Sequence, residues 1–283
     1  MKEICIFIFI NFLSCILANN YPSYAGPPYL YNSGGEATGT HYDYPQNGNC
    51  GYGNLFGRLG PHTNNIVAVN THLFNSTLQC GQCYDLFINN KTLTVIVTDQ
   101  CPDPGWCDSH HTHFDLYKPA FELLQDPNIL GTMSNITFKK VPCPIQGNIH
   151  VYLKPGYSQY YQSILIFNHT IGIESVDILK ENTTQYTPMR RTFDNHWEPV
   201  VWGNPGNSYK LRINSVLGES VVAIIDQPCS DKLYDSGAQF SRIPGPTDGI
   251  NPFYSMDTTS SANTQPTYSI THIVLLFLLF LYF

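Results

Sequence analysis

Six of the nine cysteines lie between positions 50 and 143, and this crowding limits the folds open to the chain more than any other feature of the sequence. An even set of cysteines within one segment of an exported chain predicts three disulfides that cross-link a single domain. The six are Cys50, Cys80, Cys83, Cys101, Cys107 and Cys143.

Zinc ligation is the alternative use of these cysteines, because Cys80 and Cys83 form a tight pair and three histidines, His110, His111 and His113, follow at a short distance. No second tight pair completes a tetrahedral set, so disulfides are favoured and no metal is expected. Cys229 is left over, and we expect a buried thiol there, with a bond to another chain as the alternative.

The N-terminus predicts export. Residues 1–18 carry Lys2, then an apolar run, and finish on Ala18, which is the pattern of a secretory signal. Five sequons agree with passage through a glycosylating compartment, and we expect glycosylation there. Their asparagines are Asn75, Asn90, Asn135, Asn168 and Asn182.

The C-terminus predicts attachment to a membrane. Residues 273–283 are uniformly apolar, but such a run is too short for a bilayer helix, which needs about 20 residues. The small residues Ser260, Ser261 and Ala262 precede it, followed by a polar spacer, as in the signal for a GPI anchor. We therefore expect a linker over 242–262 and an anchor signal over 263–283, with a short single-pass tail as the alternative.

Composition narrows the class of partner. The chain has 14 Lys and Arg against 21 Asp and Glu and no basic run, which argues against nucleic acid. Only 12% of residues are charged while 13% are aromatic, and aromatic faces suit neutral ligands such as sugars. These numbers are typical of a globular, aromatic-rich protein, which we expect to be a monomer.

The pattern of the middle of the chain predicts strands and turns. Gly, Pro and Asn clusters separate the β-rich runs, and only residues 118–124 resemble a helix, with Pro119 in its first turn. The cysteine-bearing segment, residues 25–146, therefore predicts one domain, and residues 147–241 predict a β-sandwich. The predicted strands are 65–70, 83–88, 92–98, 136–141, 149–153, 160–167, 173–179, 209–213 and 221–225.

Six short motifs follow one another through the first domain: Gly-Glu-Ala-Thr from Gly35, Gly-Asn-Cys-Gly-Tyr-Gly-Asn from Gly48, Cys-Gly-Gln-Cys-Tyr from Cys80, Val-Thr-Asp from Val97, His-Phe-Asp-Leu from His113 and Val-Pro-Cys from Val141. In this order they resemble the expansins. The resemblance implies an all-β fold: a six-stranded double-psi β-barrel related to family 45 endoglucanases, then an immunoglobulin-like carbohydrate-binding β-sandwich, with an open groove across both.

The family's disulfide pattern, carried over by position, implies the pairs Cys50–Cys80 and Cys83–Cys143. Plant members usually place the third pair elsewhere, so Cys101–Cys107 is the pair that remains.

The resemblance also implies the groove residues. Asp115 matches the acid of the related endoglucanases, Asp99 is the second acidic residue of the expansin groove, and Thr38 is the groove threonine, with Thr40 as the alternative register. His113 lies two residues before Asp115 and so shares its face in an extended strand.

Hydrolysis of a glycoside ordinarily needs two carboxyl groups, and the base that those enzymes carry on the first strand is missing here. Asp43 is the remaining carboxylate to consider, but its parity opposes that of Thr38, so it would need a bulge to reach the groove.

In the second domain, bacterial expansins are similar around Lys154 and the pair Tyr160 and Tyr161, and Phe193, with its neighbour Trp197, is the nearest match for a third aromatic. Flat rings stack on the C–H faces of glucose units. Because adjacent strand residues face opposite ways, Tyr160 and Tyr161 can both serve only if the strand entry is twisted or bulged.

Together these features predict an extracellular expansin-like protein that binds cellulose or a related β-glucan and loosens noncovalent contacts without hydrolysis, with no metal or organic cofactor. The alternatives are a glucan hydrolase or lytic transglycosylase on the same barrel, and a structural cellulose-binding coat protein.

Overall fold

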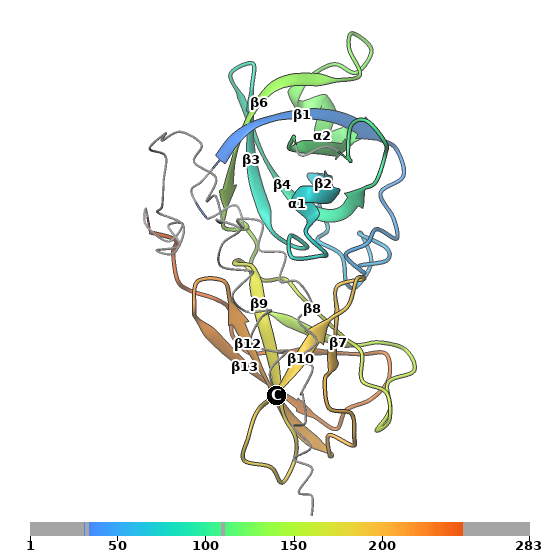
Figure 1. The fold of residues 1–283 in the computed structure, drawn as a ribbon, viewed down its shortest axis with the longest axis vertical. Helices are drawn as coiled ribbons and strands as arrows, with labels where there is room; N and C mark the ends of the chain where they lie inside the picture. Colours follow the sequence, from blue (N-terminus) through green and yellow to red (C-terminus); the bar gives the residue numbers. More distant parts are fainter. Residues whose placement is uncertain (1–30, 32–33, 109–110, 246–283) are drawn as a thin grey trace, which may run out of the picture. The chain divides into compact units, whose positions relative to one another are not determined.

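The computed structural model describes residues 31, 34–108 and 111–245, and these form an all-β protein (Figure 1). The predicted signal over 1–18 and anchor signal over 263–283 lie outside the described residues, as does most of the linker predicted over 242–262. Among the described residues, no helix is both long and apolar enough to cross a membrane.

Six strands close into a barrel in the order β1-β5-β2-β4-β3-β6, as the resemblance implied. Val67, Val69, Phe114 and Leu116 fill its interior, because alternate residues of a strand face inward. The strands are β1 (Gly34–Tyr42), β2 (Ile66–Asn70), β3 (Cys83–Ile88), β4 (Lys91–Cys101), β5 (His113–Tyr117) and β6 (Met133–Val141).

Two short helices cover the barrel strands. The helix predicted from Pro119 is confirmed as α2 (Lys118–Leu124), which buries Ala120, Phe121 and Leu124. The other, α1 (Thr71–Phe74), is a single turn that the sequence pattern does not predict.

Three disulfides cross-link the barrel segment: Cys50–Cys80, Cys83–Cys143 and Cys101–Cys107. The first two are the pairs that the resemblance implied, and the third is the pair that was expected from the two cysteines that remained. The last encloses a short loop at the end of β4, which becomes important at the site below.

Eight further strands form the second domain, hydrogen-bonded in the order β13-β12-β9-β10-β11-β8-β7-β14. Strand β10 pairs with β9 through Thr187 and Pro188 and with β11 from Met189 onward, so the sheet divides there into two layers that enclose one apolar core. This is the predicted sandwich. The strands are β7 (His150–Leu153), β8 (Ile164–Phe167), β9 (Ile173–Leu179), β10 (Thr187–Arg191), β11 (His196–Pro199), β12 (Ser208–Ser215), β13 (Ser220–Asp226) and β14 (Lys232–Asp235).

Among the described residues, Tyr31 precedes the barrel in the chain yet belongs to the sandwich core. Tyr31 is buried among the sandwich residues, and its hydroxyl accepts a hydrogen bond from the backbone N–H of Gly172 at 2.9 Å. The side-chain nitrogen of Lys140, on β6, lies 5.0 Å from the centre of the Tyr31 ring. The described residues of barrel and sandwich belong to one compact unit.

Two expectations about the backbone of the second domain and its cysteine are wrong. The strand predicted over 160–167 begins only at Ile164, because residues 158–161 form a turn closed by Ser158 and Tyr161. Cys229 is an exposed thiol instead of a buried one. It lies in the turn between β13 and β14, where Gln227 and Asp231 have positive φ and the chain runs over the surface.

Candidate functional site

Four residues lie side by side across four neighbouring barrel strands. Thr40 on β1 pairs with Asp115 on β5, Asp115 pairs with Ala68 on β2, and Ala68 pairs with Asp99 on β4. Since one strand separates the two acids and strands are about 4.8 Å apart, their Cα atoms are about 9.6 Å apart. The barrel therefore brings the two sequence-predicted acids onto one row with a threonine.

Hydroxyl groups on β1 hold this row. The Thr40 hydroxyl donates to Asp115 Oδ1 at 2.6 Å and lies 2.9 Å from His113 Nε2, while the Thr38 hydroxyl lies 2.8 Å from His113 Nδ1. Both registers left open by the sequence are thus used: Thr38 contacts the histidine, and Thr40 contacts histidine and acid. His113 and Asp115 share a face, as expected.

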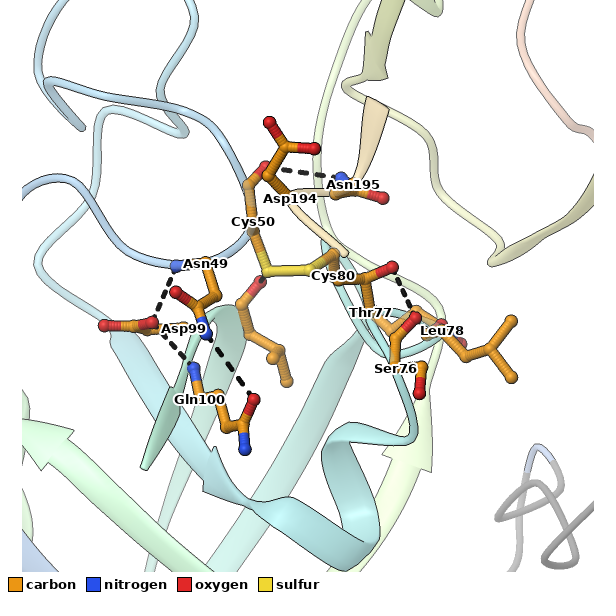
Figure 2. Close-up of a disulfide and its surroundings, with 12 residues drawn as sticks. Asn49, Cys50, Ser76, Thr77, Leu78, Cys80, Asp99, Gln100, Asp194 and Asn195 are labelled. Carbon is orange, nitrogen blue, oxygen red and sulfur yellow. Dashed lines mark hydrogen bonds between the residues drawn. A yellow bond between two sulfur atoms is a disulfide. The ribbon is translucent and has the colours of Figure 1, made fainter. Parts of the chain in front are cut away.

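A β-bulge sets the position of Asp99. Val67 pairs with Val97, but the next residue, Ala68, pairs with Asp99, so Thr98 is the extra residue on β4. Asp99 Oδ1 then accepts hydrogen bonds from the backbone N–H groups of Asn49 and Gln100, each at 2.7 Å (Figure 2). One carboxylate oxygen is thereby committed to the backbone.

Burial governs the protonation of the site. It raises the pKa of Asp115, which the hydrogen bond from Thr40 partly offsets and the nearby Asp103 raises further. Burial also raises the pKa of Asp99, against the two backbone hydrogen bonds, and lowers the pKa of His113 to about 4. Near neutral pH the histidine is therefore uncharged, and the acids hold protons more readily than free carboxyl groups do.

Trp106 is a site residue that sequence reasoning missed. It lies on the loop closed by Cys101–Cys107, its ring is centred 5.6 Å from that of His113, and 48% of the residue is exposed. A tryptophan between Gly105 and Cys107 in a Pro- and Gly-rich loop was the available signal. Its exposed face can stack on an apolar ring surface beside the acids.

Asp43, the alternative base, does not join the row. It follows the end of β1, is exposed, and has an oxygen 3.9 Å from Lys118 Nζ.

The sandwich presents several exposed aromatic rings. Tyr160 and Tyr161 are both exposed because they lie in the turn before β8, where strand alternation does not apply. Tyr161 stacks in parallel on Trp202, with ring centres 6.2 Å apart and planes at 10°, and 43% of Trp202 is exposed. Phe193 is exposed in the turn between β10 and β11. The missed ring, Trp202, follows two exposed valines in the Gly- and Pro-rich loop after β11.

Trp197 is wrong as a sugar-stacking residue. Only 3% of it is exposed, since it faces the sandwich core, and the Arg191 guanidinium covers its ring at 4.6 Å. A ring enclosed in this way cannot reach a polysaccharide surface.

Lys154 directly follows β7 and pairs with Asp194, with Nζ 3.1 Å from Oδ2. Burial alone would raise the pKa of Asp194. The pKa is nevertheless lowered to about 2, because Thr192 and Lys154 donate hydrogen bonds to the carboxylate and the charges of His196 and Lys154 favour its ionised form. The lysine is thus held beside Phe193.

A series of contacts joins the row of acids on the barrel to the exposed rings of the sandwich, and Figure 2 shows the part between Asp99 and Asp194. The backbone N–H of Asn49 donates a hydrogen bond to Asp99. The carbonyl oxygen of the following residue, Cys50, accepts a hydrogen bond from the side chain of Asn195. Asp194, which precedes Asn195, forms an ion pair with Lys154. The backbones come so close that a Cβ on Gly51 would lie 2.6 Å from the Asp194 carbonyl oxygen, so only glycine fits there.

All five sequon asparagines have positive φ, between 44° and 61°. Asn168 differs from the exposed Asn90, Asn135 and Asn182, because its amide donates to the carbonyl oxygens of Gln146 and Asn148.

Fold and site together define a class: two-domain all-β proteins in which a closed six-stranded barrel, bearing two acids on its outer face, is followed by a sandwich with exposed aromatic rings. Matches to known families specify it further. Residues 1–138 match the expansin N-terminal domain, and residues 145–241 match the expansin-like protein middle domain.

Among similar proteins, expansin-like protein 6 of Dictyostelium discoideum is 37% identical over 247 residues, which cover 86% of this chain and 84% of that protein. Expansin-A13 of rice is 27% identical over 213 residues, which cover 68% of this chain and 76% of that protein. The chain belongs to the expansin family.

Solved structures support the fold. The apo expansin of Clavibacter michiganensis superposes with a TM-score of 0.63 at 22% identity, covering 75% of this chain and all of the other. A mutant of that expansin, solved in complex with cellohexaose, superposes with a TM-score of 0.62 at 20% identity and the same coverage.

Proposed function

We propose that this chain is an extracellular expansin that binds cellulose or a related β-glucan and loosens noncovalent contacts between glucan chains without hydrolysing them. The observation that carries the proposal is the hydrogen bond from Thr40 to Asp115. The endoglucanase relatives place their base on the first strand. Here the described part of that strand turns hydroxyl groups, not carboxylates, toward Asp115.

Binding rests on the aromatic rings. Tyr161 with Trp202 offers a stacked pair on the sandwich, and Phe193 and Trp106 add exposed faces on the sandwich and the barrel. Burying such faces against sugar C–H groups contributes about 25 cal/mol per Å² and needs no charge. The complex of a structural relative with cellohexaose supports a glucan as ligand.

Loosening would come from the acids. Asp115 and Asp99, with pKa values raised by burial, can donate or accept hydrogen bonds on a glucan chain drawn across the row. Thr38, Thr40 and His113 would hold that chain in a displaced conformation. The family consists of non-hydrolytic wall-loosening proteins in general, which supports this role.

The rest of the proposal concerns location. The signal over 1–18 and the anchor signal over 263–283 would place the folded domains outside the cell and tether them to its membrane, with glycans on exposed sequons.

Hydrolysis is the second candidate, and the row itself favours it. Two acids about 9.6 Å apart at Cα can bring their carboxyl groups within the about 6.5–9.5 Å of inverting glycosidases. Against it, Asp99 Oδ1 is already occupied by two backbone N–H groups.

Two measurements separate these functions. Retention on crystalline cellulose tests binding, and creep of a cellulose-based wall sheet under load tests loosening. We expect both, with no reducing ends released from soluble glucan. Turnover that disappears in Asp115→Asn would establish hydrolysis in place of loosening, and failure to bind glucan would refute the proposal as a whole.

A further inference from the structure

A cavity of about 570 Å³ opens on the barrel and shares none of its lining residues with the row that carries Asp115. Its walls come from the loop before β2, from Cys83 at the start of β3, from residues 92–96 of β4, and from residues 144–146 of the segment that links barrel to sandwich. Asn168, at the end of β8, completes it. The volume is within the about 300–1,000 Å³ of small-molecule sites.

The chemistry of the lining selects a neutral, hydroxylated ligand. None of the residues that line the cavity is charged, which leaves nothing to pair with a phosphate, a carboxylate or a cation. Asn65, Thr92 and Gln146 each place an uncharged polar side chain there, and within the described part of the chain these side chains make no hydrogen bond. Pro61 and Ile145 supply apolar surface. Hydroxyl-bearing rings with C–H faces match both kinds of surface.

The walls are held in place before any ligand arrives. The Cys83–Cys143 disulfide fixes the start of the linker, and Asn168 donates to the carbonyl oxygen of Gln146 at 3.0 Å. The Thr94 hydroxyl is bound to Asp85 at 2.6 Å, which fixes its orientation on β4. A preformed site loses less entropy on binding.

We propose that this cavity is a second saccharide site, which binds a short neutral sugar between the barrel and the linker. Two sources can supply that chemistry. One is the end of a free oligosaccharide. The other is the chain's own N-linked glycan on Asn90, which lies exposed in the turn before β4. Thr92, the third residue of that sequon, lines the cavity about 7 Å further along the strand.

The first experiment uses purified protein from a host that does not N-glycosylate, carrying Asp115→Asn and Tyr161→Ala so that the proposed groove is disabled. Amide NMR signals of Thr92, Ile145 and Gln146 are followed during titration with cellobiose and with N,N'-diacetylchitobiose. We expect saturable shifts with at least one sugar. Loss of one neutral hydrogen bond in Thr92→Val should weaken binding by about two- to tenfold.

Thr184→Val is the matched control. Thr184 is also an exposed sequon threonine, but it lies between β9 and β10 of the sandwich and does not line the cavity. It should leave the affinity unchanged. Absence of shifts with both sugars, or equal affinity in Thr92→Val, would overturn the proposal. Shifts at the cavity, together with no retention of the unsubstituted protein on crystalline cellulose, would refute the proposed function alone.

The second experiment identifies the source. Protein from a glycosylating host is analysed by mass spectrometry for occupancy of Asn90, then titrated as before. If its own glycan fills the cavity, added sugar causes no shift until Asn90→Gln removes that glycan, and Asn182→Gln does not restore the response. If sugar binds equally well beside a fully occupied Asn90, the ligand is a free saccharide. Either result supports the site.

Discussion

The side-chain amide of Asn195 donates a hydrogen bond to the carbonyl oxygen of Cys50, 3.3 Å away, and so ties the turn between β10 and β11 to the disulfide-bearing loop of the barrel (Figure 2). Two more contacts reinforce this junction: Arg191 donates a hydrogen bond to the Thr77 carbonyl at 2.9 Å, and the Thr77 hydroxyl oxygen lies 3.2 Å from the Thr192 carbonyl oxygen. The sandwich thus touches the loop that positions Asp99.

Replacing Asn195 with glycine tests this junction without backbone strain, because both residues tolerate the positive φ of 61° found there. The Cys50 carbonyl would lose its partner in a buried place, so we expect the free energy of unfolding to fall by about 1–3 kcal/mol in urea denaturation. Asn182→Gly, at a φ of 58° on the exposed surface, is the control and should change little. Equal losses in both variants would contradict a role for the hydrogen bond.

Thr40→Val should raise the pKa of Asp115 further, since the hydrogen bond from Thr40 stabilises the ionised carboxylate. Asp115 would then deprotonate at higher pH, and a carboxyl-carbon NMR titration measures that shift directly. Thr94→Val removes an equivalent hydroxyl from Asp85 and should leave the titration of Asp115 as it was. If the titration midpoint of Asp115 is unchanged in Thr40→Val, the hydrogen bond from Thr40 does not influence the pKa of Asp115.

Lys140 should make stability depend on pH. Burial lowers the pKa of Lys140 from 10.5 to about 7, so between these values the unfolded chain holds the proton and the folded chain does not. The free energy of unfolding therefore rises with pH across this range, by up to about 1.4 kcal/mol per unit.

Lys140→Met should remove that slope and stabilise the protein most below pH 7. Its neighbour variant Lys139→Met should retain it. Urea denaturation at a series of pH values measures the free energy of unfolding of each protein. If this free energy depends on pH in the same way in the wild type and in Lys140→Met, Lys140 is not the cause of the pH dependence.

The two tryptophans of the sandwich should behave in opposite ways. Trp197→Ala removes a core ring and should cost about 3–5 kcal/mol of stability. Trp202→Ala removes an exposed ring, so we expect an unchanged melting temperature but weaker retention on cellulose. Thermal denaturation and a cellulose pull-down on both variants check this, and a Trp202→Ala protein that binds normally would exclude the stacked pair from the binding surface.

Local patterns were enough to predict much of the fold. The bounds of β3, β9 and α2 agree with the sequence-based prediction, because each has clear periodicity or a proline that marks its start. The groove acids came from the motifs around Val97 and His113, and the structure brings both onto one row.

Other features depend on contacts that no local pattern records. Periodicity cannot tell which side of the four-residue strand β11 faces inward, so the sequence alone does not show that Trp197 is buried. Trp106 and Trp202 lie in loops, where exposure is set by the surrounding fold. The bulge at Thr98 appears only when β4 is paired with β2.

Tyr31 gives the fold an unusual order of assembly. This ring comes before the barrel in the chain but packs among residues of the sandwich, which follows the barrel, so the sandwich core needs a residue that is synthesised before the barrel. Lys140 and Gln82 of the barrel both lie against it, the first through the ring and the second through the hydroxyl at 3.5 Å. During synthesis the ring therefore stays without its sandwich neighbours until the second domain has been made, so completion of the sandwich core is a late, long-range event.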